Sequence, residues 1–93
     1  MTAYALVTLN VTDEETFSAY REAAGPAMAK HGATPLSVSR EATVIEGDDP
    51  APNVTVILQF EDREAAQGWI SDSEIAHVHE MRKASGASKI ILM

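Results

Sequence analysis

Apolar and polar residues alternate along four segments of the chain, and this pattern predicts four β-strands. The first segment, residues 3–11, reads Ala-Tyr-Ala-Leu-Val-Thr-Leu-Asn-Val and is rich in residues that favour strands. Similar patterns follow over residues 34–46, 53–60 and 88–93. Within the second segment, the run Arg40-Glu41-Ala42 indicates a bend. We therefore expect four strands, the second of them bent.

A helical period appears after the first of these segments. Apolar or aromatic side chains recur there at steps of three or four, at Phe17, Tyr20, Ala24, Met28 and His31. Thr12 opens a capping box with Glu15, so we expect Thr12 to cap the helix. Gly32 should end it. Pro26 lies inside the pattern and predicts a kink or a break near residues 22–25, because proline cannot donate the helical hydrogen bond.

Two helix-start signals precede the last strand. Asp62 can cap a helix over residues 63–70, and the run Ser71-Asp72-Ser73-Glu74 can restart a helix that continues through Ala84 and ends at Gly86. The predicted order is β-α-β-β-α-β. This is the order of a ferredoxin-like α+β sandwich, a four-stranded antiparallel sheet with two helices on one face. We expect one such domain over residues 1–93.

Both faces of the predicted sheet are apolar. One face is suited to packing against the helices and consists of Val7, Leu9, Val54, Val56, Leu58, Phe60, Ile90 and Leu92. The other face contains Tyr4, Leu6, Ile57, Ile91 and Met93 among polar residues. Leaving such side chains in water forgoes about 1.5–3 kcal/mol each. We therefore predict a homodimer through this second face; the alternative is a monomer with an open apolar sheet.

Composition and charge exclude several classes of function. Fourteen acidic residues against seven basic ones give a net charge of −7, which disfavours nucleic acids and anionic membranes as partners. The absence of cysteine excludes disulfides, thiolate nucleophiles and iron–sulfur clusters. No apolar run approaches the roughly 20 residues of a membrane span. The first residues lack the basic segment of a secretory signal, so we expect a cytoplasmic protein.

An ordered set of residues extends over nearly the whole chain: Thr12-Asp13, Tyr20, Gly32, Glu46-Gly47, residues 54–60, Ala65, Ala66, Trp69, Ser73, Glu74, Arg82 and Ser88. With this set the chain resembles the domain-of-unknown-function family 1330. The resemblance implies a dimeric α/β barrel, formed by two ferredoxin-like units packed sheet to sheet, and it implies no agreed activity. Two positions depart from the family pattern. Arg40-Glu41-Ala42 replaces a usual glycine pair, and Ile75 replaces an aromatic residue.

The three histidines differ in their expected surroundings. His31 ends the apolar face of the first helix, where a capping role is favoured over catalysis. His77 and His79 lie two positions apart on a helix, about 200° around it, so they cannot bind one metal ion together. Ile75 and Val78 mark the buried stripe of that helix. We therefore expect His79 to face inward, with packing as its first role, and His77 to face solvent.

Three other features were candidates for chemistry. Trp69 fits the apolar pattern of its helix and is interpreted first as a core residue. Arg82 lies on the buried stripe, where a guanidinium needs a carboxylate or an anionic ligand; Glu46 or Asp62 could serve as a structural partner. The pair Asp48-Asp49 could bind a cation, but a solvated loop is favoured. No phosphate loop, catalytic triad or metal cluster is evident.

Three hypotheses for function remain open. The first is a site for binding or transforming a small organic molecule, without a tightly bound cofactor or a metal. This site would lie between the helices and the second face of the sheet. Its expected residues are His79 and Arg82 for catalysis and Tyr4, Thr8, Gln59 and Trp69 for binding.

The second hypothesis is a non-catalytic dimeric scaffold or regulatory module, in which all these residues are structural. The third is a monooxygenase of the antibiotic-biosynthesis or haem-degrading type. The combination of Asn10, Trp69 and His79 suggests that comparison, although Asn10 lies at the end of its strand and not in the middle.

Overall fold

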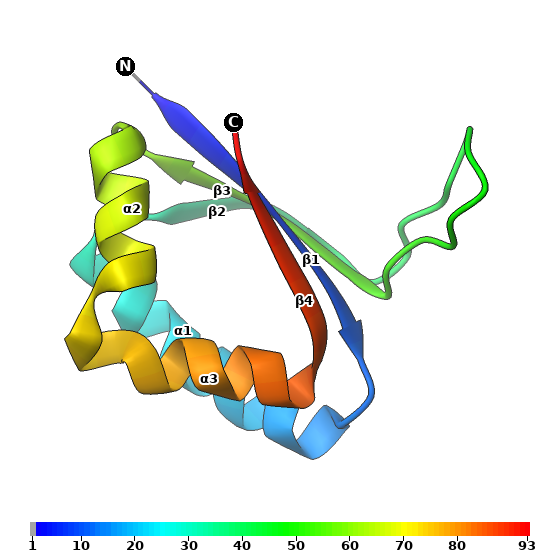
Figure 1. The fold of residues 1–93 in the computed structure, drawn as a ribbon, viewed down its shortest axis with the longest axis horizontal. Coiled ribbons are helices and arrows are strands. Elements are labelled where there is room, and N and C mark those ends of the chain that lie inside the picture. Colours follow the sequence, from blue (N-terminus) through cyan, green and yellow to red (C-terminus); the bar gives the residue numbers. More distant parts are fainter. Residues whose placement is uncertain (1) are drawn as a thin grey trace.

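A computed structural model describes residues 2–93 and contains the predicted order of elements (Figure 1). Four strands form one antiparallel sheet in the order β2-β3-β1-β4, and the helices pack on one of its faces. The elements are β1 (Ala3–Val11), α1 (Glu14–Lys30), β2 (Thr34–Ser39), β3 (Val54–Phe60), α2 (Arg63–Ser71), a 3₁₀ turn (Ser73–Ile75), α3 (Ala76–Ser85) and β4 (Gly86–Leu92). The predicted ferredoxin-like fold is confirmed. The sheet is open, with edges at β2 and β4.

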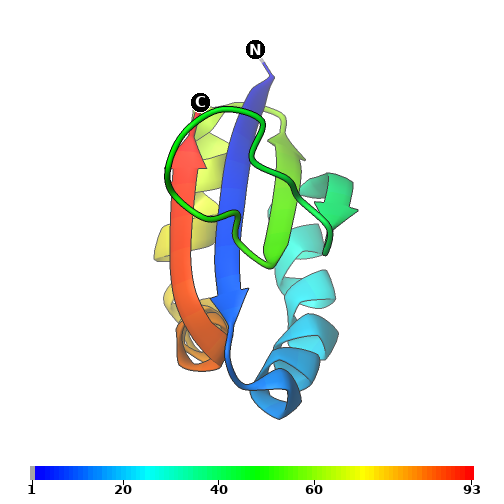
Figure 2. The same ribbon diagram turned by 90° about the vertical axis from the view of Figure 1, so that its right-hand side faces the viewer.

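The register of the central strands decides which side chains meet the helices. In β1, Val7 pairs with Val56 of β3 and with Ile90 of β4. Alternate residues of β1 on this side, including Leu9, are buried, whereas Tyr4 on the other side is 38% exposed. The predicted division of the sheet into two faces is confirmed. Figure 2 shows the second face, which we call the open face, towards the viewer, with the helices behind it.

Helix α1 begins one residue later than the capping box implied. The cap is Asp13, whose Oδ1 accepts a hydrogen bond from the backbone N–H of Thr16 at 3.1 Å. Its Oδ2 accepts a second one from the Thr16 hydroxyl at 2.7 Å. The prediction of Thr12 as the cap was wrong, because the chain leaves β1 with Thr12 N–H bonded to the carbonyl of Ser85. A carboxylate at the helix start also interacts well with the helix dipole.

The sequence predicted a kink or a break near residues 22–25. The break does not occur, because helix α1 continues past Pro26 to Lys30. One steric conflict of a helical proline is with the Cβ of the residue before it, and it is absent here because that residue is Gly25. Two costs remain on this exposed part of the helix: one missing hydrogen bond, and the crowding of the proline ring against the backbone carbonyl four residues earlier. Gly32 ends the helix with φ of 69°, the left-handed conformation that favours glycine.

Strand β2 is shorter than predicted. It ends at Ser39, which pairs with Thr55, and residues 40–53 form an irregular arm instead of a bent strand. A longer β2 would have to pair with the residues before Val54, where Pro50 and Pro52 lack the N–H that a ladder needs. In Figures 1 and 2 the arm projects from the sheet on the side away from the helices.

Two aspartates cap the second helical segment. Asp62 is the cap that was predicted, and Asp72 is the capping residue within the predicted run Ser71-Asp72-Ser73-Glu74. Asp62 Oδ1 accepts from Ala65 N–H at 2.8 Å, and Asp72 Oδ1 accepts from Glu74 N–H at 2.9 Å. Gly86 ends α3 and at once begins β4, two residues earlier than expected. A Cβ at this position would lie 1.8 Å from the backbone oxygen of Asn10, so the close approach of β4 to β1 requires glycine.

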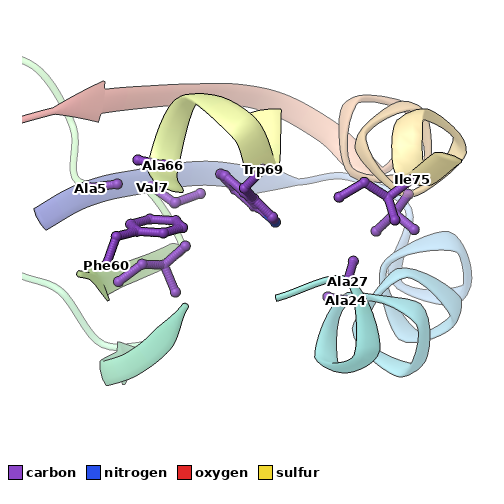
Figure 3. Close-up of a cluster of buried hydrophobic side chains, with 10 residues drawn as sticks. Ala5, Val7, Ala24, Ala27, Phe60, Ala66, Trp69 and Ile75 are labelled. Carbon is purple, nitrogen blue, oxygen red and sulfur yellow. The ribbon is translucent and has the colours of Figure 1, made fainter. Parts of the chain in front are cut away.

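Trp69 joins α2 to the sheet, as the sequence predicted for a core residue. It is 3% exposed and its ring centroid lies 5.7 Å from that of Phe60 (Figure 3). Ile75 closes the same core against Ala24 and Ala27 of α1. In residues 2–93, no helix is both long and apolar enough to cross a membrane.

Candidate ligand-binding cavity

A cavity of about 290 Å³ lies between α1 and the helix-facing side of the sheet. Strands β1 and β3 form its floor, α1 and β2 form its walls, and one residue of α3 closes it. The lining residues are Val7, Leu9, Phe17, Tyr20, Arg21, Ala24, Met28, Pro35, Val38, Val54, Val56, Leu58 and Arg82. The cavity is therefore mainly apolar, with two guanidinium groups and one hydroxyl.

The packing of α1 explains why this space is open. Helix α1 packs chiefly along α3 and not along the strands. The buried core accordingly divides into two clusters, one around Trp69 and one around Phe17, and both Tyr20 and Val56 contact each of them. Short β2 does not fill the gap, since its Val38 is 64% exposed. The cavity thus lies at the join between the two clusters.

Arg82 is the buried cation of this site. It is 2% exposed; its Nε donates to Ser88 Oγ at 3.1 Å and its Nη1 donates to His79 Nδ1 at 2.8 Å. Within residues 2–93, no carboxylate lies within 4.0 Å of its guanidinium. The structural partners considered from the sequence, Glu46 and Asp62, are therefore both excluded. A buried charge without a counter-charge is costly and uncommon.

His79 holds Arg82 through a defined tautomer. His79 is 5% exposed, and its Nε2 lies 2.9 Å from the backbone oxygen of Trp69. A carbonyl can only accept, so Nε2 bears the proton and Nδ1 accepts from Arg82. Burial lowers the pKa of His79 below its ordinary value of 6.5, and the charge of Arg82 lowers it further against the raising effect of the Trp69 carbonyl. The imidazole is therefore neutral near pH 7.

Two aromatic rings flank the guanidinium of Arg82. Its Cζ lies 5.7 Å from the ring centroid of Trp69 and 5.9 Å from that of Tyr20. The Trp69 ring in turn meets the His79 ring edge-on, with centroids 4.8 Å apart. Cation–π contacts at this range hold a guanidinium without neutralising it. Arg82 is thus fixed in place while it keeps its charge.

The C-terminal end of α3 is anchored where Arg82 lies. Ser85 is fully buried, and its hydroxyl donates to the backbone oxygen of Arg82 at 2.7 Å. The Ser85 carbonyl accepts from the backbone N–H groups of Thr12 and Asp13 at 2.9 and 3.1 Å. These bonds tie the turn between β1 and α1 to α3. The backbone that bears Arg82 is therefore anchored by hydrogen bonds to this turn.

Of the sequence-predicted residues, the structure brings Trp69, His79 and Arg82 together but separates the other three from them. Tyr4, Thr8 and Gln59 lie on the open face, where Tyr4 pairs with Gln59 across β1 and β3. The expected pocket between the helices and this second face does not exist, because the helices cover the first face. The cavity lies on that first face instead.

Asn10 is also distant from the cavity. It is exposed near the end of β1, and its Oδ1 accepts from the N–H of Asn53 at 3.2 Å. The side chain of Asn53 makes two hydrogen bonds with the backbone of Val11: Oδ1 accepts from the N–H, and Nδ2 donates to the carbonyl. These bonds fix the base of the arm to β1. The combination of Asn10 with Trp69 and His79 is therefore not assembled in one site.

Sequence reasoning missed the α1 wall of the cavity. Phe17, Tyr20 and Met28 were read as the packing face of a helix, which they are, but their outer parts border open space. Tyr20 provides the one hydroxyl among the lining residues. A partial signal existed, because this apolar face is long and Arg21 lies next to Tyr20 within it. The sequence pattern could not predict the distance between α1 and the strands.

The charge of the cavity is opposite to that of the protein. Two of the seven basic residues, Arg21 and Arg82, line it, and none of the fourteen acidic residues does. In the part of the chain that the structure describes, no group of three His, Asp or Glu side chains could hold a metal ion. Asp48 and Asp49 are exposed in the arm. The charged side chains that line the cavity are therefore all cationic.

The remaining histidines lie elsewhere. His77 faces solvent, as predicted. His31 follows α1, and its Nε2 lies 2.8 Å from Asp72 Oδ2, which also binds Lys30 Nζ at 2.7 Å. Hydrogen bonds from Lys30 and His31 keep the pKa of Asp72 well below its ordinary range. This cluster joins α1 to the α2–α3 junction and has a structural role.

Comparison with protein-family models identifies the family of the chain. Residues 2–93 match the model of DUF1330, described as a domain of unknown function. The chain belongs to this family. The DUF1330 match covers the described residues from the start of β1 to the C-terminus and confirms the resemblance seen in the sequence. No curated protein sequence matches the chain.

Solved structures with the same fold include three of interest. RPA0582 from Rhodopseudomonas palustris, a protein of unknown function, has a TM-score of 0.81 at 17% identity over 99% of this chain and 80% of its own. A dimeric ferredoxin-like protein of unknown function from Jannaschia sp. CCS1 has a TM-score of 0.71 at 17% identity, over 100% and 98%. SnoaB, a cofactor-independent oxygenase from Streptomyces nogalater, has a TM-score of 0.57 at 15% identity, over 99% and 88%. These likenesses show the fold.

Proposed function

We propose that this DUF1330 protein binds a small organic molecule in the cavity between α1 and the sheet, and that it does so as a homodimer. The observation that supports binding most strongly is the cavity itself. Its volume of about 290 Å³ lies just below the range of small-molecule sites, about 300–1,000 Å³. Its composition of apolar walls with a few polar groups is typical of such sites.

The roles of individual residues follow from the geometry. Arg82 borders the cavity, and in this proposal it is the residue that contacts the ligand. His79 does not line the cavity, and both of its ring nitrogens are engaged, so it serves as a positioning residue for Arg82. Trp69 supports both of them from the core. Tyr4, Thr8 and Gln59 belong to the open face and, in this proposal, to the dimer interface.

Unfavourable exposure supports the dimer. A compact monomer of this mass exposes about 5,200 Å², whereas this chain exposes 5974 Å². On the open face, Ile57 is 39% exposed and Ile91 is 43% exposed. The arm projects on the same side and contains Ile45, which is 97% exposed. A second copy packed sheet to sheet would cover these side chains, and the Jannaschia protein of the same fold is described as dimeric.

The oxygenase hypothesis has less support. SnoaB shares the fold, but a shared fold does not imply a shared reaction. The combination that suggested the comparison requires Asn10 beside Trp69 and His79, and Asn10 is bonded to the base of the arm instead. The proposal of ligand binding does not depend on oxygen chemistry.

A first experiment is native mass spectrometry of gently purified protein. We expect the mass of two chains, together with any molecule that remains bound. A stable monomer would contradict the dimer. A bound mass would give the ligand class directly, and a bare dimer leads to the binding experiment below.

A second experiment tests the cavity with a matched pair of variants. The amide signals of ¹⁵N-labelled protein are followed by NMR during titration with a library of small neutral, cationic and anionic organic molecules. Val38→Trp places a large ring at the rim of the cavity, at a residue that is already 64% exposed. Leu36→Trp is the control, because Leu36 is on the same strand, is 52% exposed and does not line the cavity.

We expect some library members to shift the amides of α1, β2 and β3 in the wild type. Those shifts should disappear in Val38→Trp and persist in Leu36→Trp. If no library member shifts these amides, or if Val38→Trp binds as the wild type does, the cavity is not a binding site. In that case the scaffold hypothesis is the one that remains.

A further inference from the structure

We infer that the ligand of this cavity is an organic monocarboxylate, with its carboxylate on Arg82 and its apolar part against α1 and β3. This inference rests on the proposed function and adds the chemical class of the ligand. Three independent observations support it: the missing counter-charge, the unused donors of Arg82, and the distribution of charge around the cavity.

The first observation concerns the burial of Arg82. Removing a guanidinium from water is strongly unfavourable unless an anion compensates it. Arg82 is 2% exposed, yet its two hydrogen-bond partners, the Ser88 hydroxyl and His79 Nδ1, are neutral. A folded protein keeps such a charge at a cost in stability, and a bound anion is the simplest compensation.

The second observation concerns the donors that remain. A guanidinium has five N–H groups. Two of them are used by Ser88 and His79, and no acceptor among residues 2–93 is bonded to Nη2. In the described part of the chain, Thr55 Oγ1 is the only side-chain polar atom that is both fully enclosed and without a hydrogen-bond partner. Nη2 also has no partner, so Nη2 is not fully enclosed. Nη2 therefore reaches open space, and the space that Arg82 borders is the cavity.

The third observation concerns the rest of the lining. Arg21 is the second charged residue there, and it is exposed beside the ring of Phe17, with its Cζ 5.9 Å from the ring centroid. No acidic side chain lines the cavity, although the protein has a net charge of −7. An anion is thus favoured locally and a cation is disfavoured.

The shape of the site favours a carboxylate with an apolar body over a free inorganic anion. Arg82 lies at one side of a space whose other walls are Phe17, Met28, Val54 and similar residues. A guanidinium binds a planar carboxylate through parallel N–H donors, and the apolar walls gain only from burying carbon. Acetate has almost no carbon to bury, so it should bind weakly.

The experiment compares acids with amides of nearly the same shape. Hexanoate with hexanamide and phenylacetate with phenylacetamide are titrated into the dimer, and acetate is added as the anion without an apolar body. Binding is followed through the amide signals of the cavity by NMR and through heat by calorimetry. We expect each acid to bind at least about ten-fold more tightly than its amide, because hydrogen bonds between charged groups are the stronger ones.

Variants identify the residue responsible. Arg82→Met should remove the preference for each acid over its amide, whereas Arg82→Lys keeps the charge without the planar fork and should retain part of the preference. Lys83→Met is the control. It removes one positive charge from the same helix, at a side chain that is 61% exposed and bonded to Glu80, and it should behave as the wild type.

The outcomes separate this inference from the proposed function. Equal affinity for acids and amides in the wild type overturns the carboxylate assignment and leaves the binding cavity intact. The carboxylate assignment is also overturned, and the binding cavity left intact, if neutral or cationic library members bind and the acids fail to bind. Loss of the acid preference in Lys83→Met as well as in Arg82→Met also overturns the assignment. Absence of any binder overturns both proposals.

Discussion

At the scale of single residues, the main feature of this protein is a buried pair formed by a neutral imidazole and a permanently charged guanidinium. His79 donates to the Trp69 carbonyl and accepts from Arg82, so one ring links the core of α2 to the cavity. Protonation of His79 would remove its acceptor and place two positive charges side by side. The geometry of Arg82 therefore depends on His79 staying neutral.

A pH profile of stability tests this dependence. The pKa of His79 is lowered in the folded protein, so the unfolded chain binds the proton more tightly, and the stability provided by neutral His79 is complete above its ordinary pKa of 6.5. That stability is lost as the pH falls below this value and through the lower folded pKa. We expect the free energy of unfolding, measured by urea titration at about pH 7.5 and about pH 5.5, to fall clearly in the wild type.

His79→Gln keeps an N–H donor for the Trp69 carbonyl but cannot be protonated, so its free energy of unfolding should fall less over the same range. His77→Gln is the matched control, because His77 is exposed on the same helix and its loss should leave the wild-type profile unchanged. Identical profiles for wild type and His79→Gln would mean that His79 is not held neutral by the fold.

At the scale of elements, helix α1 determines where the cavity lies. Helix α1 tolerates Pro26 because Gly25 precedes the proline. Helix α1 packs mainly against α3, and this packing leaves space between its inner face and strands β1 and β3. The 3₁₀ turn after Asp72 has a comparable effect, since it changes direction between α2 and α3 and brings Arg82 opposite Tyr20. The packing of α1 and the 3₁₀ turn thus together position the charged and aromatic residues of the site.

Pro26 provides a prediction at this scale. Pro26→Ala should restore one helical hydrogen bond and remove the ring, which favours folding by about 3 kcal/mol in a helix interior. It also frees the unfolded chain, which opposes folding by up to about 1 kcal/mol. We expect a net gain of about 2 kcal/mol in the free energy of unfolding, measured with urea. Pro50→Ala in the arm should change it by less than about 0.5 kcal/mol.

A decrease in stability on Pro26→Ala would show that the proline is needed where it is. The conformation of α1 at Pro26 would then be necessary for its packing against the rest of the protein.

At the scale of the whole molecule, the two faces of the sheet have different tasks. The helix-facing side contains the core and the cavity, and the open face remains apolar without a cover from its own chain. In the proposed dimer the second copy provides that cover. The arm of residues 40–53 projects on this same side of the sheet (Figure 2). Binding and assembly would then use opposite faces and could be altered separately.

Two variants with nearly equal exposure test this division. Ile91 on the open face is 43% exposed and Ile70 on α2 is 45% exposed. Ile91→Lys should convert the dimer to a monomer, because it would bury an unpaired charge in each half of the interface. Ile70→Lys should leave the dimer intact. Sedimentation or native mass spectrometry measures the result, and a dimer that survives Ile91→Lys would place the interface elsewhere.

Local pattern was enough to establish most of the fold. The period of two in the strands, the period of three to four in the helices, and the caps Asp62 and Asp72 depend on neighbouring residues, so the sequence alone contained them. It also placed His79 and Arg82 on a buried stripe. The errors, at Thr12, Pro26 and residues 40–46, arose where a distant partner or a missing Cβ outweighed the local signal.

The site itself was decided by tertiary structure. Three findings depend on distances between segments that are remote in the sequence. Arg82 has no carboxylate partner, α1 leaves space between its inner face and the sheet, and the opposite face contains Tyr4, Thr8 and Gln59. Spacing along the chain does not determine such distances, because they follow from how helices and strands pack around a common core. The buried arginine was visible in the sequence, and the cavity it faces was not.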